Sequence, residues 1–340
     1  MLRKETLLNI KNVYTTNAFP MGSGMYVGAG SETEELVFLY NLETGMCYRL
    51  EGCPGGMMSF LPLPGHPDHM VSIMGLFPPF IGKEAGLYLH HREGKKWITE
   101  KVLDLPFAHR CEFLERSGKV FLVLASVSKH KENPADWSQP GETHLISLDE
   151  IPSGSWETDL VDVSTYRNHG MTKARINDQE TVCISGAEGI FAVVQNGDDQ
   201  WELRKVFDRE VSEMVFMDLD GDGNNELVTI EPFHGNTLNM YKKVDGRWDK
   251  KFSDTLSFGH GLSGGVYHSE PMIIAGNRSD SLALESFRIS DLSGGKVSRT
   301  VLEQDAGPTQ TQVFSCNSQD YILSANQKKN EVALYTGSLD

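Results

Sequence analysis

The chain alternates between short apolar runs, rich in Val, Ile, Leu, Phe and Tyr, and breaks that contain Gly, Asn, Asp or Pro. Short runs with β-branched and aromatic residues are typical of strands, and the breaks are typical of tight turns. No long stretch shows the 3.6-residue apolar period of an amphipathic helix. The pattern therefore predicts an all-β protein.

One hairpin pattern recurs along the chain, and self-similarity of this kind indicates a repeat architecture. In each copy an apolar strand passes through a tight turn into a second strand, which in several copies begins with Trp97, Trp156, Trp201 or Trp248. The turns lie at Glu43–Gly45, Glu93–Gly94, Ser153–Gly154, Asn196–Gly197, Asp245–Gly246 and Gly294–Gly295. A more buried pair of strands precedes each hairpin. Four strands in each of about seven repeats predict a seven-bladed β-propeller.

The two ends of the chain complete this pattern. Val332–Tyr335 reads as the first strand of a seventh hairpin, whereas Leu2–Ile10 reads as a strand without a hairpin of its own. Pairing these two strands would close the ring and cover an exposed sheet edge. We therefore expect a single propeller domain over residues 1–340, closed by its N-terminal strand.

Charge, hydropathy and cysteine content limit the partners and the cellular location that we expect. The 47 acidic and 31 basic side chains give a formal net charge of −16, and no basic block offers a nucleic-acid partner a binding face. No segment approaches the about 20 apolar residues of a membrane helix, so we expect no membrane partner. The five cysteines are odd in number and form no CxxC pair, which predicts reduced thiols and a cytoplasmic location.

An acidic loop, Asp218-Leu-Asp220-Gly-Asp222-Gly-Asn-Asn-Glu226, lies between two predicted strands. Its alternate carboxylates can converge when the chain turns tightly at the glycines, and oxygen ligands at this density suit Ca²⁺. It is not an EF-hand, because Thr229 stands at the twelfth position. It resembles the loops of FG-GAP or VCBS repeats in β-propellers. We expect a structural calcium site at Asp218, Asp220, Asp222 and Glu226, with a metal-free turn as the alternative.

Four histidines are expected on the opposite face from this loop. His109, His169 and His260 precede the innermost strands of blades three, four and six, and His234 lies between the second and third strands of blade five. Both kinds of connection share one face of a propeller, so the fold would gather the four imidazoles near the central channel. Neutral imidazoles suit a divalent transition metal or acid–base catalysis, although solvated loop histidines are the alternative.

Other side chains near these histidines are candidates for supporting roles. Arg110 and Arg167 adjoin them in sequence and could bind substrate oxygens. Glu231 could contribute a carboxylate or orient an imidazole. Tyr166 is a candidate acid or base.

The run Ile230-Glu-Pro-Phe-His-Gly-Asn-Thr237, which follows the acidic loop, resembles the propeller domain of the fungal aldos-2-ulose dehydratases, also called 1,5-anhydrofructose dehydratases. The His-Arg and His-Gly pairs before the inner strands fit the same resemblance, which covers blades three to six. Those enzymes also carry cupin domains, which have no counterpart here. The resemblance implies a lyase that removes water from a keto-sugar by β-elimination.

We therefore predict a metal-dependent carbohydrate lyase or dehydratase with a small sugar substrate and Zn²⁺, Mn²⁺ or Mg²⁺ at the histidine cluster. The metal would polarise a ketone, a base would take the α-proton, and an acid would protonate the departing hydroxyl. Histidine-lined propellers of the oligogalacturonate lyase type catalyse related eliminations, so uronates are also open. The alternatives are a non-catalytic propeller that binds a sugar or a protein partner, and a hydrolase or epimerase.

Overall fold

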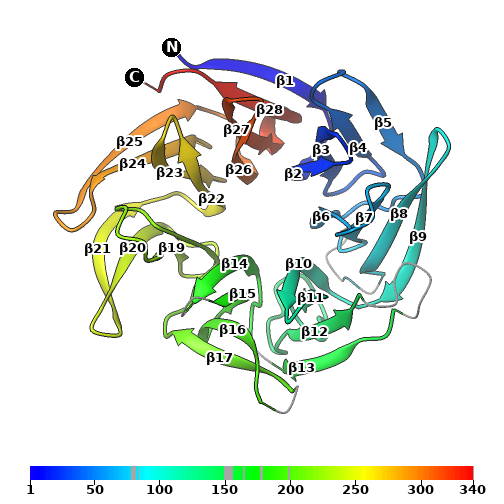
Figure 1. Cartoon of the computed structure of the whole chain (residues 1–340), viewed down its shortest axis with the longest axis horizontal. Helices are drawn as coiled ribbons and strands as arrows, with labels where there is room; N and C mark the ends of the chain where they lie inside the picture. Colours follow the sequence, from blue (N-terminus) through cyan, green and yellow to red (C-terminus); the bar gives the residue numbers. More distant parts are fainter. Residues whose placement is uncertain are drawn as a thin grey trace.

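The computed structural model describes residues 1–77, 82, 84–148, 156–163, 165–176, 179–197 and 200–339. Within these ranges the strands form seven four-stranded antiparallel sheets, arranged as blades around a central axis (Figure 1). The predicted seven-bladed β-propeller is confirmed. The turn predicted at Ser153–Gly154 lies outside the described residues.

In each blade the strands follow one another from the axis outwards. Blades 1 to 3 contain β2 (Val13–Met21), β3 (Gly24–Ser31), β4 (Val37–Asn41), β5 (Cys47–Leu50), β6 (Ser59–Pro62), β7 (His69–Met74), β8 (Gly86–Glu93), β9 (Lys96–Asp104), β10 (Ala108–Arg116), β11 (Lys119–Ser126), β12 (Glu142–Ser147) and β13 (Asp159–Val163). Blades 4 to 6 contain β14 (Gly170–Ile176), β15 (Gln179–Gly186), β16 (Gly189–Gln195), β17 (Trp201–Phe207), β18 (Glu213–Met217), β19 (Glu226–Glu231), β20 (Thr237–Val244), β21 (Arg247–Thr255), β22 (Gly259–Tyr267), β23 (Glu270–Asn277), β24 (Leu284–Asp291) and β25 (Lys296–Glu303). Blade 7 contains β26 (Pro308–Cys316), β27 (Gln319–Asn326), β28 (Glu331–Thr336) and β1 (Arg3–Asn9), with the short 3-10 turn η1 (Gln327–Lys329) between β27 and β28.

Blade 7 closes the ring. Strand β1 pairs antiparallel with β28, from Arg3 opposite Thr336 to Asn9 opposite Glu331, and the two chain ends lie side by side (Figure 1). The Lys4 ammonium forms an ion pair with Glu303 on β25 of blade 6, 2.7 Å away, and another with Glu331. The predicted pairing of the N-terminal strand with the last blade is confirmed.

The tryptophans of the hairpin pattern join neighbouring blades. Trp248 on β21 donates its indole N–H to the carbonyl oxygen of Val206 on β17, 2.9 Å away. Trp201 meets the Phe121 ring of blade 3 edge-on, with centroids 5.0 Å apart. Trp156 does not begin a strand as predicted, because β13 starts at Asp159. Trp201 and Trp248 therefore each place a large ring against the neighbouring blade.

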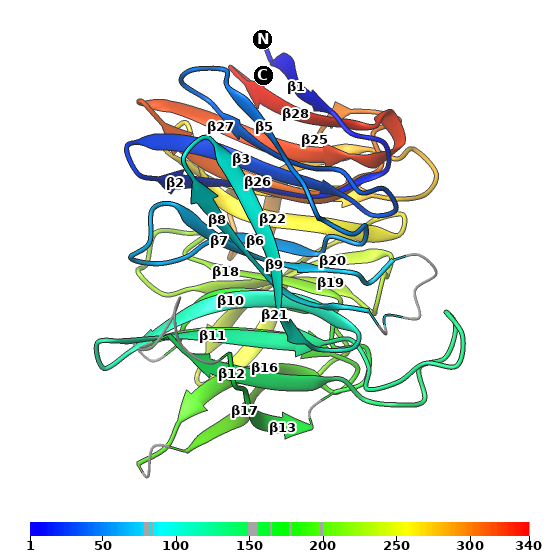
Figure 2. The ribbon, with the colours of Figure 1, turned by 90° about the vertical axis from the view of Figure 1, so that its right-hand side faces the viewer.

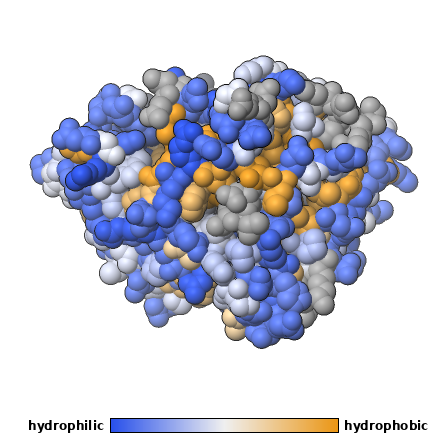
Figure 3. All heavy atoms as spheres, turned by 90° about the horizontal axis from the view of Figure 1, so that it is seen from below, coloured by the Kyte–Doolittle hydropathy of each residue, from blue (hydrophilic) through white to orange (hydrophobic). Residues whose placement is uncertain are grey.

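Viewed from its edge, the disc shows strands that run between its two faces (Figure 2). The side of the disc that carries blades 3 and 4 is largely hydrophilic, with an apolar area near its middle (Figure 3). No helix in the described ranges is long and apolar enough to cross a membrane. All five cysteines are free thiols, as the odd count predicted.

Candidate functional site

The residues that begin the innermost strands form a ring around the axis, and we call them the axial ring. Its seven members are all buried: Tyr14, Met58, His109, His169, Ser212, His260 and Thr309. Among the described strands, the pairing of β2, β10, β22 and β26 with their second strands shifts register at this level. A bulge of this kind turns a side chain out of the ladder and can aim it at a site. Tyr14, His109, His260 and Thr309 lie within these shifts.

The four predicted histidines meet near the axis. The ring centroid of His169 lies 4.4 Å from that of His109, 4.8 Å from that of His234 and 5.4 Å from that of His260. His234 is 5.1 Å from His260, again between centroids. Nitrogen atoms of His169, His234 and His260 all lie within 4.8 Å of one another. The fold thus brings together imidazoles from blades 3, 4, 5 and 6, and three of them could share one ion.

Hydrogen bonds to the next blade orient three of these rings. Nδ1 of His109 lies 3.2 Å from the carbonyl oxygen of His169, and Nδ1 of His169 lies 3.4 Å from that of Ser212. Nδ1 of His260 lies 2.8 Å from the carbonyl oxygen of Thr309. A carbonyl oxygen can only accept, so Nδ1 must carry the proton in each case. In the neutral ring, Nε2 then keeps its lone pair. This is the tautomer in which imidazoles commonly ligate a metal through Nε2.

Nε2 of His169 and Nε2 of His234 lie 3.3 Å apart. Because Nδ1 of His169 carries its proton, its Nε2 can only accept. The contact is therefore a hydrogen bond when His234 is protonated on Nε2, and a cation can bridge the two nitrogens when it is not. Two nitrogens bound to one tetrahedral Zn²⁺ at 2.0–2.1 Å would be about 3.3–3.4 Å apart.

Electrostatic surroundings keep most of these rings neutral. Burial lowers the pKa of His109 and of His260 well below the usual range, and neighbouring imidazoles and Arg110 add to the effect. Burial, with help from His169, lowers the pKa of His234 to about 2. A neutral imidazole is the form that binds a metal ion.

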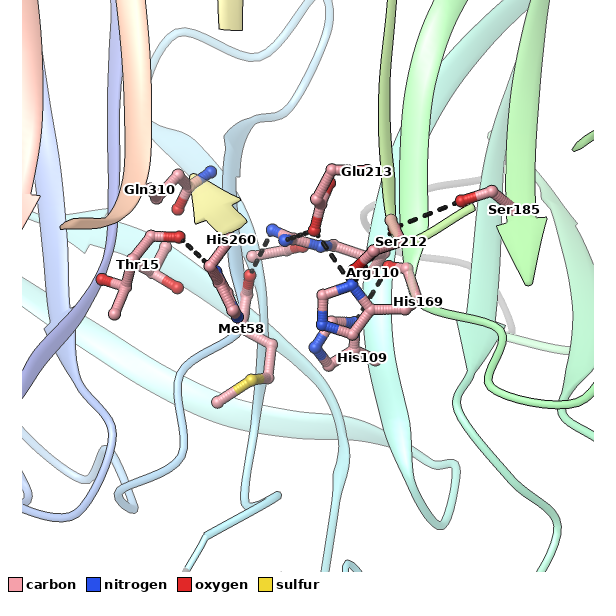
Figure 4. Close-up of polar contacts among 12 residues, drawn as sticks. Thr15, Met58, His109, Arg110, His169, Ser185, Ser212, Glu213, His260 and Gln310 are labelled. Atoms are coloured by element: carbon pink, nitrogen blue, oxygen red, sulfur yellow. Dashed lines mark hydrogen bonds and ion pairs between the residues drawn. The ribbon is translucent and has the colours of Figure 1, made fainter. Parts of the chain in front are cut away.

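A buried ion pair lies beneath the cluster. Glu213 accepts hydrogen bonds from Arg110 and from Nδ1 of His169, each at 3.0 Å (Figure 4). Burial raises the pKa of this carboxyl, but Arg110 and His169 outweigh burial and hold the pKa below its usual value. Glu213 therefore stays ionised and orients His169. Glu213 begins β18 next to the axial ring, and the sequence analysis did not predict it.

Tyr14 is a second missed residue. Its hydroxyl lies 2.8 Å from Nε2 of His260, whose other nitrogen is a donor, so the hydroxyl donates this bond. Burial raises the pKa of Tyr14 to about 12. The group is therefore protonated at neutral pH and can act as an acid. Its position at the start of the inner strand of blade 1 matches that of the histidines, which could have identified it.

Aromatic rings line the open side of the cluster. Phe233 stacks on His234 with centroids 4.0 Å apart, and Trp137 from the long connection of blade 3 meets Phe233 at 5.1 Å. On the other side of His234, Phe258 lies 4.8 Å away and is 38% exposed. Rows of ring faces beside polar groups suit ligands with both apolar and polar surfaces.

The backbone at this side of the cluster is strained. Arg167, His234 and Phe258 adopt φ values of 56°, 47° and 55°, which non-glycine residues rarely take. Such conformations cost of the order of 1–3 kcal/mol each and concentrate at functional sites. Tight turns on the opposite face, such as those at Ser117, His268 and Asn317, take the same φ region, so these values describe the turns and do not by themselves mark the site.

A cavity of about 330 Å³ follows the axis on the other side of the ring. Inner strands of blades 4 to 7 wall it, and Arg110, Glu213 and His260 contribute to its lining. This volume is at the lower end of small-molecule sites. The cluster thus lies between an aromatic mouth and a polar internal cavity.

The structure does not bring every predicted residue to the cluster. Glu231 is buried and accepts hydrogen bonds from the hydroxyls of Thr229 and Tyr241, so Glu213 takes the orienting role proposed for it. Tyr166 is 41% exposed, and its described hydrogen bonds are backbone contacts on the rim. Arg167 pairs with Glu210 and lies 5.7 Å from the Phe233 ring, at the edge of the site. Arg110 is committed to Glu213.

The acidic loop connects β18 to β19, on the face opposite the histidines. Carboxylate oxygens of Asp218, Asp220 and Asp222 lie within 4.8 Å of one another. Glu226 lies just outside this group: it is buried, one carboxylate oxygen accepts the Leu219 N–H at 2.8 Å, and the other lies 3.7 Å from the Lys242 ammonium. The Lys242 ammonium lies among these acids, in ion pairs with Asp220 and, at 2.8 Å, with Asp222.

Comparisons with known proteins establish the fold. No family model and no curated protein matches the chain. The chain is similar to a streptogramin B lyase, with a TM-score of 0.61 and 11% identity over 98% of this chain and 97% of the other. It is also similar to a Bacteroides uniformis protein provisionally assigned as a 6-phosphogluconolactonase, with a TM-score of 0.59 and 12% identity over 96% and 91% of the two chains. A third match is the β-propeller domain of Cps50 (Swd1) from Myceliophteria thermophila, with a TM-score of 0.58 and 8% identity over 95% and 100%. At these identities the likeness shows the fold alone.

Proposed function

We propose that this chain is a metal-dependent lyase that eliminates water or an alcohol from a sugar. The observation that carries the proposal is the convergence of ring nitrogens from His169, His234 and His260 within 4.8 Å of one another, with Nε2 of His169 and Nε2 of His234 3.3 Å apart. Nε2 of His260 accepts the Tyr14 hydroxyl in the structure, and a bound ion would replace this hydrogen bond. Backbone carbonyls and Glu213 fix the tautomers of His169 and His260 from outside the cluster. A donor set of three imidazoles is typical of catalytic zinc sites with an open position.

A divalent ion held there would polarise a carbonyl next to the carbon that loses its proton. His109 keeps its Nε2 lone pair, because its Nδ1 donates to the His169 carbonyl, so it is our candidate acceptor of the α-proton. Tyr14 is our candidate acid, since its protonated hydroxyl lies at the cluster and can give its proton to the departing oxygen. The aromatic row supports a sugar, whose C–H faces commonly lie on aromatic rings.

The resemblance of the sequence to the aldos-2-ulose dehydratases and to FG-GAP or VCBS propellers supports this proposal. It favours a keto-sugar over other substrates, while the geometry alone supports any elimination beside a carbonyl. The first experiment is metal analysis of protein purified without chelator, followed by tests of 2-keto sugars for a new enone absorbance. Protein that binds no ion and turns over none of these sugars, but binds them through the aromatic row, would favour the non-catalytic alternative.

Replacing Tyr14 by phenylalanine should distinguish the role of Tyr14 as proton donor from the binding of the metal ion. The ring and its packing remain, but the departing oxygen loses its proton donor, so we expect kcat to fall about 10²- to 10⁴-fold. Metal content and melting temperature should stay near those of the wild type. An unchanged kcat would remove Tyr14 from the mechanism.

We also propose that the acidic loop binds Ca²⁺ in competition with Lys242. The Lys242 ammonium is the cation that balances Asp220 and Asp222, and these partners raise its pKa. Lys242→Gln leaves the carboxylates without a cation, so the variant should melt at a lower temperature in chelator and recover when Ca²⁺ is added. Asp220→Ala should abolish the calcium effect. A Lys242→Gln protein with one melting temperature under both conditions would contradict a calcium site.

A further inference from the structure

Arg278 follows β23 in the connection that crosses the open side of the histidine cluster. Its guanidinium lies 5.7 Å from the Tyr14 ring and 5.9 Å from the Phe258 ring. Its backbone N–H donates to the carbonyl oxygens of Ser257 and Phe258, at 3.1 and 3.0 Å. Two aromatic faces and the backbone thus hold the side chain beside Tyr14, whose hydroxyl contacts the cluster.

Arg278 differs from the other arginines of the site because its guanidinium forms no direct ion pair with a carboxylate of the described residues. The guanidinium groups of Arg110 and Arg167 form ion pairs with Glu213 and Glu210. Arg278 instead donates to the neutral amide oxygen of Gln327, and no carboxylate in the described part of the chain forms an ion pair with it. A guanidinium has five N–H donors, so most of its donors remain available.

The amide of Gln327 separates Arg278 from an acid of blade 1. Its Nε2 donates to the Glu32 carboxylate at 2.8 Å, while its oxygen accepts from Arg278. Burial raises the pKa of Glu32, against the opposing influence of Arg278 and Gln327. Glu32 therefore faces the guanidinium only through the Gln327 amide.

Arg278 is also close to the candidate ligands. After burial, its charge is the largest influence that lowers the pKa of His260, and it lowers the pKa of His234 as well. A cation beside neutral imidazoles is costly unless an anion contacts it, and Glu32 reaches Arg278 only through the Gln327 amide. In a chain with a net charge of −16, such a local cation is needed to attract an anionic ligand.

We propose that Arg278 binds a carboxylate of the substrate, which makes the substrate a uronic acid or a related sugar acid. This inference rests on the proposed lyase function and narrows its substrate class. The bidentate geometry of a guanidinium matches a carboxylate. Pairing with Arg278 also reduces the negative charge beside the α-carbon, so the α-proton is easier to remove.

The elimination balances without a further reactant. His109 takes the proton from the carbon next to the carboxylate, the electrons of that C–H bond form a double bond to the β-carbon, and the β C–O bond breaks. The departing oxygen takes the Tyr14 proton and leaves as water or an alcohol. The products are an unsaturated sugar acid and the released hydroxyl compound.

The test compares probes that differ in one group, by calorimetric titration of the full chain with and without Zn²⁺. The probes are D-glucuronate, its neutral analogue D-glucuronamide, and D-glucose 6-phosphate. We expect wild-type protein to bind glucuronate at least about tenfold more tightly than glucuronamide, because a hydrogen bond to a charged group is lost with the amide. Arg278→Gln should reduce glucuronate affinity about ten- to a hundredfold and leave glucuronamide affinity unchanged. Arg278→Lys should fall between the two.

Arg288→Gln is the matched control, since it removes the same charge from an exposed arginine that pairs with Glu270. It should bind all probes as the wild type does. Equal wild-type affinity for glucuronate and glucuronamide would overturn the inference even if the arginine variant failed to fold. Arg278-dependent binding of glucose 6-phosphate in place of glucuronate would also overturn it. Arg278-dependent glucuronate binding by a protein that takes up no metal would uphold the inference and remove the proposed lyase.

Discussion

His234→Ala is expected to abolish turnover and to weaken Zn²⁺ binding by more than about 100-fold. The imidazole supplies one of three converging nitrogens, and loss of partners that only orient such ligands already costs about 10- to 100-fold in affinity. His234 lies in a connection rather than a strand, so the fold should survive. Metal content per chain, metal titration and the rate at which the conjugated unsaturated product forms measure the effect.

His268→Ala is the control for this variant. His268 is an exposed histidine between β22 and β23, on the face opposite the cluster, and it contacts the Gly337 carbonyl. Its loss should leave both metal content and turnover unchanged. A His234→Ala protein that retains a full complement of tightly bound ion would contradict the three-histidine site.

Deleting residues 1–9 should cause the largest loss of stability. The deletion removes the backbone pairing of β1 with β28, the Lys4 ion pairs and the contacts that Leu7 and Leu8 make with the core of blades 1 and 7. Backbone hydrogen bonds contribute about 1 kcal/mol each, so the free energy of unfolding should fall by several kcal/mol. Urea unfolding and thermal melting measure this change.

A synthetic peptide of residues 1–10 provides the matched control. Added to the truncated protein, it can pair with the vacant edge of β28 and should restore much of the lost stability in proportion to its concentration. A scrambled peptide should not. Truncated protein with the melting temperature of the full chain would show that the ring does not depend on this strand.

The blade pattern was predictable because it depends on local chemistry. Each hairpin carries its own turn residues and its own alternation, so the C-terminal strand Val332–Tyr335 could be recognised as lacking a partner. The histidine cluster was predictable because blade topology assigns each connection to a face. His109, His169, His234 and His260 then follow from their positions alone.

The residues that support the histidines were harder to predict, because the direction of each side chain decides whether it reaches the cluster. Glu231 adjoins His234 in sequence, yet its carboxylate bonds the Thr229 and Tyr241 hydroxyls. Glu213 is far from His169 in sequence, but it begins the inner strand of the next blade and reaches that ring at 3.0 Å. Tyr14 comes from blade 1, and Arg278 comes from a connection of blade 6 that is distant from His260 in sequence, so only the closed ring places them together.

The hydrogen bonds from side chains to backbone carbonyls between members of the axial ring run in one rotational sense. Nδ1 of His109, His169 and His260 each donates to the carbonyl of the following blade, and the Thr309 hydroxyl continues the series to the Tyr14 carbonyl at 2.7 Å. Because the backbone sets this sense, a histidine introduced at Met58 or Thr309 should inherit the same tautomer. Single substitutions could then change which positions of the axial ring carry the metal-binding histidines, without altering the blades. New metal preferences and new chemistries would be within one or two mutations of the present protein.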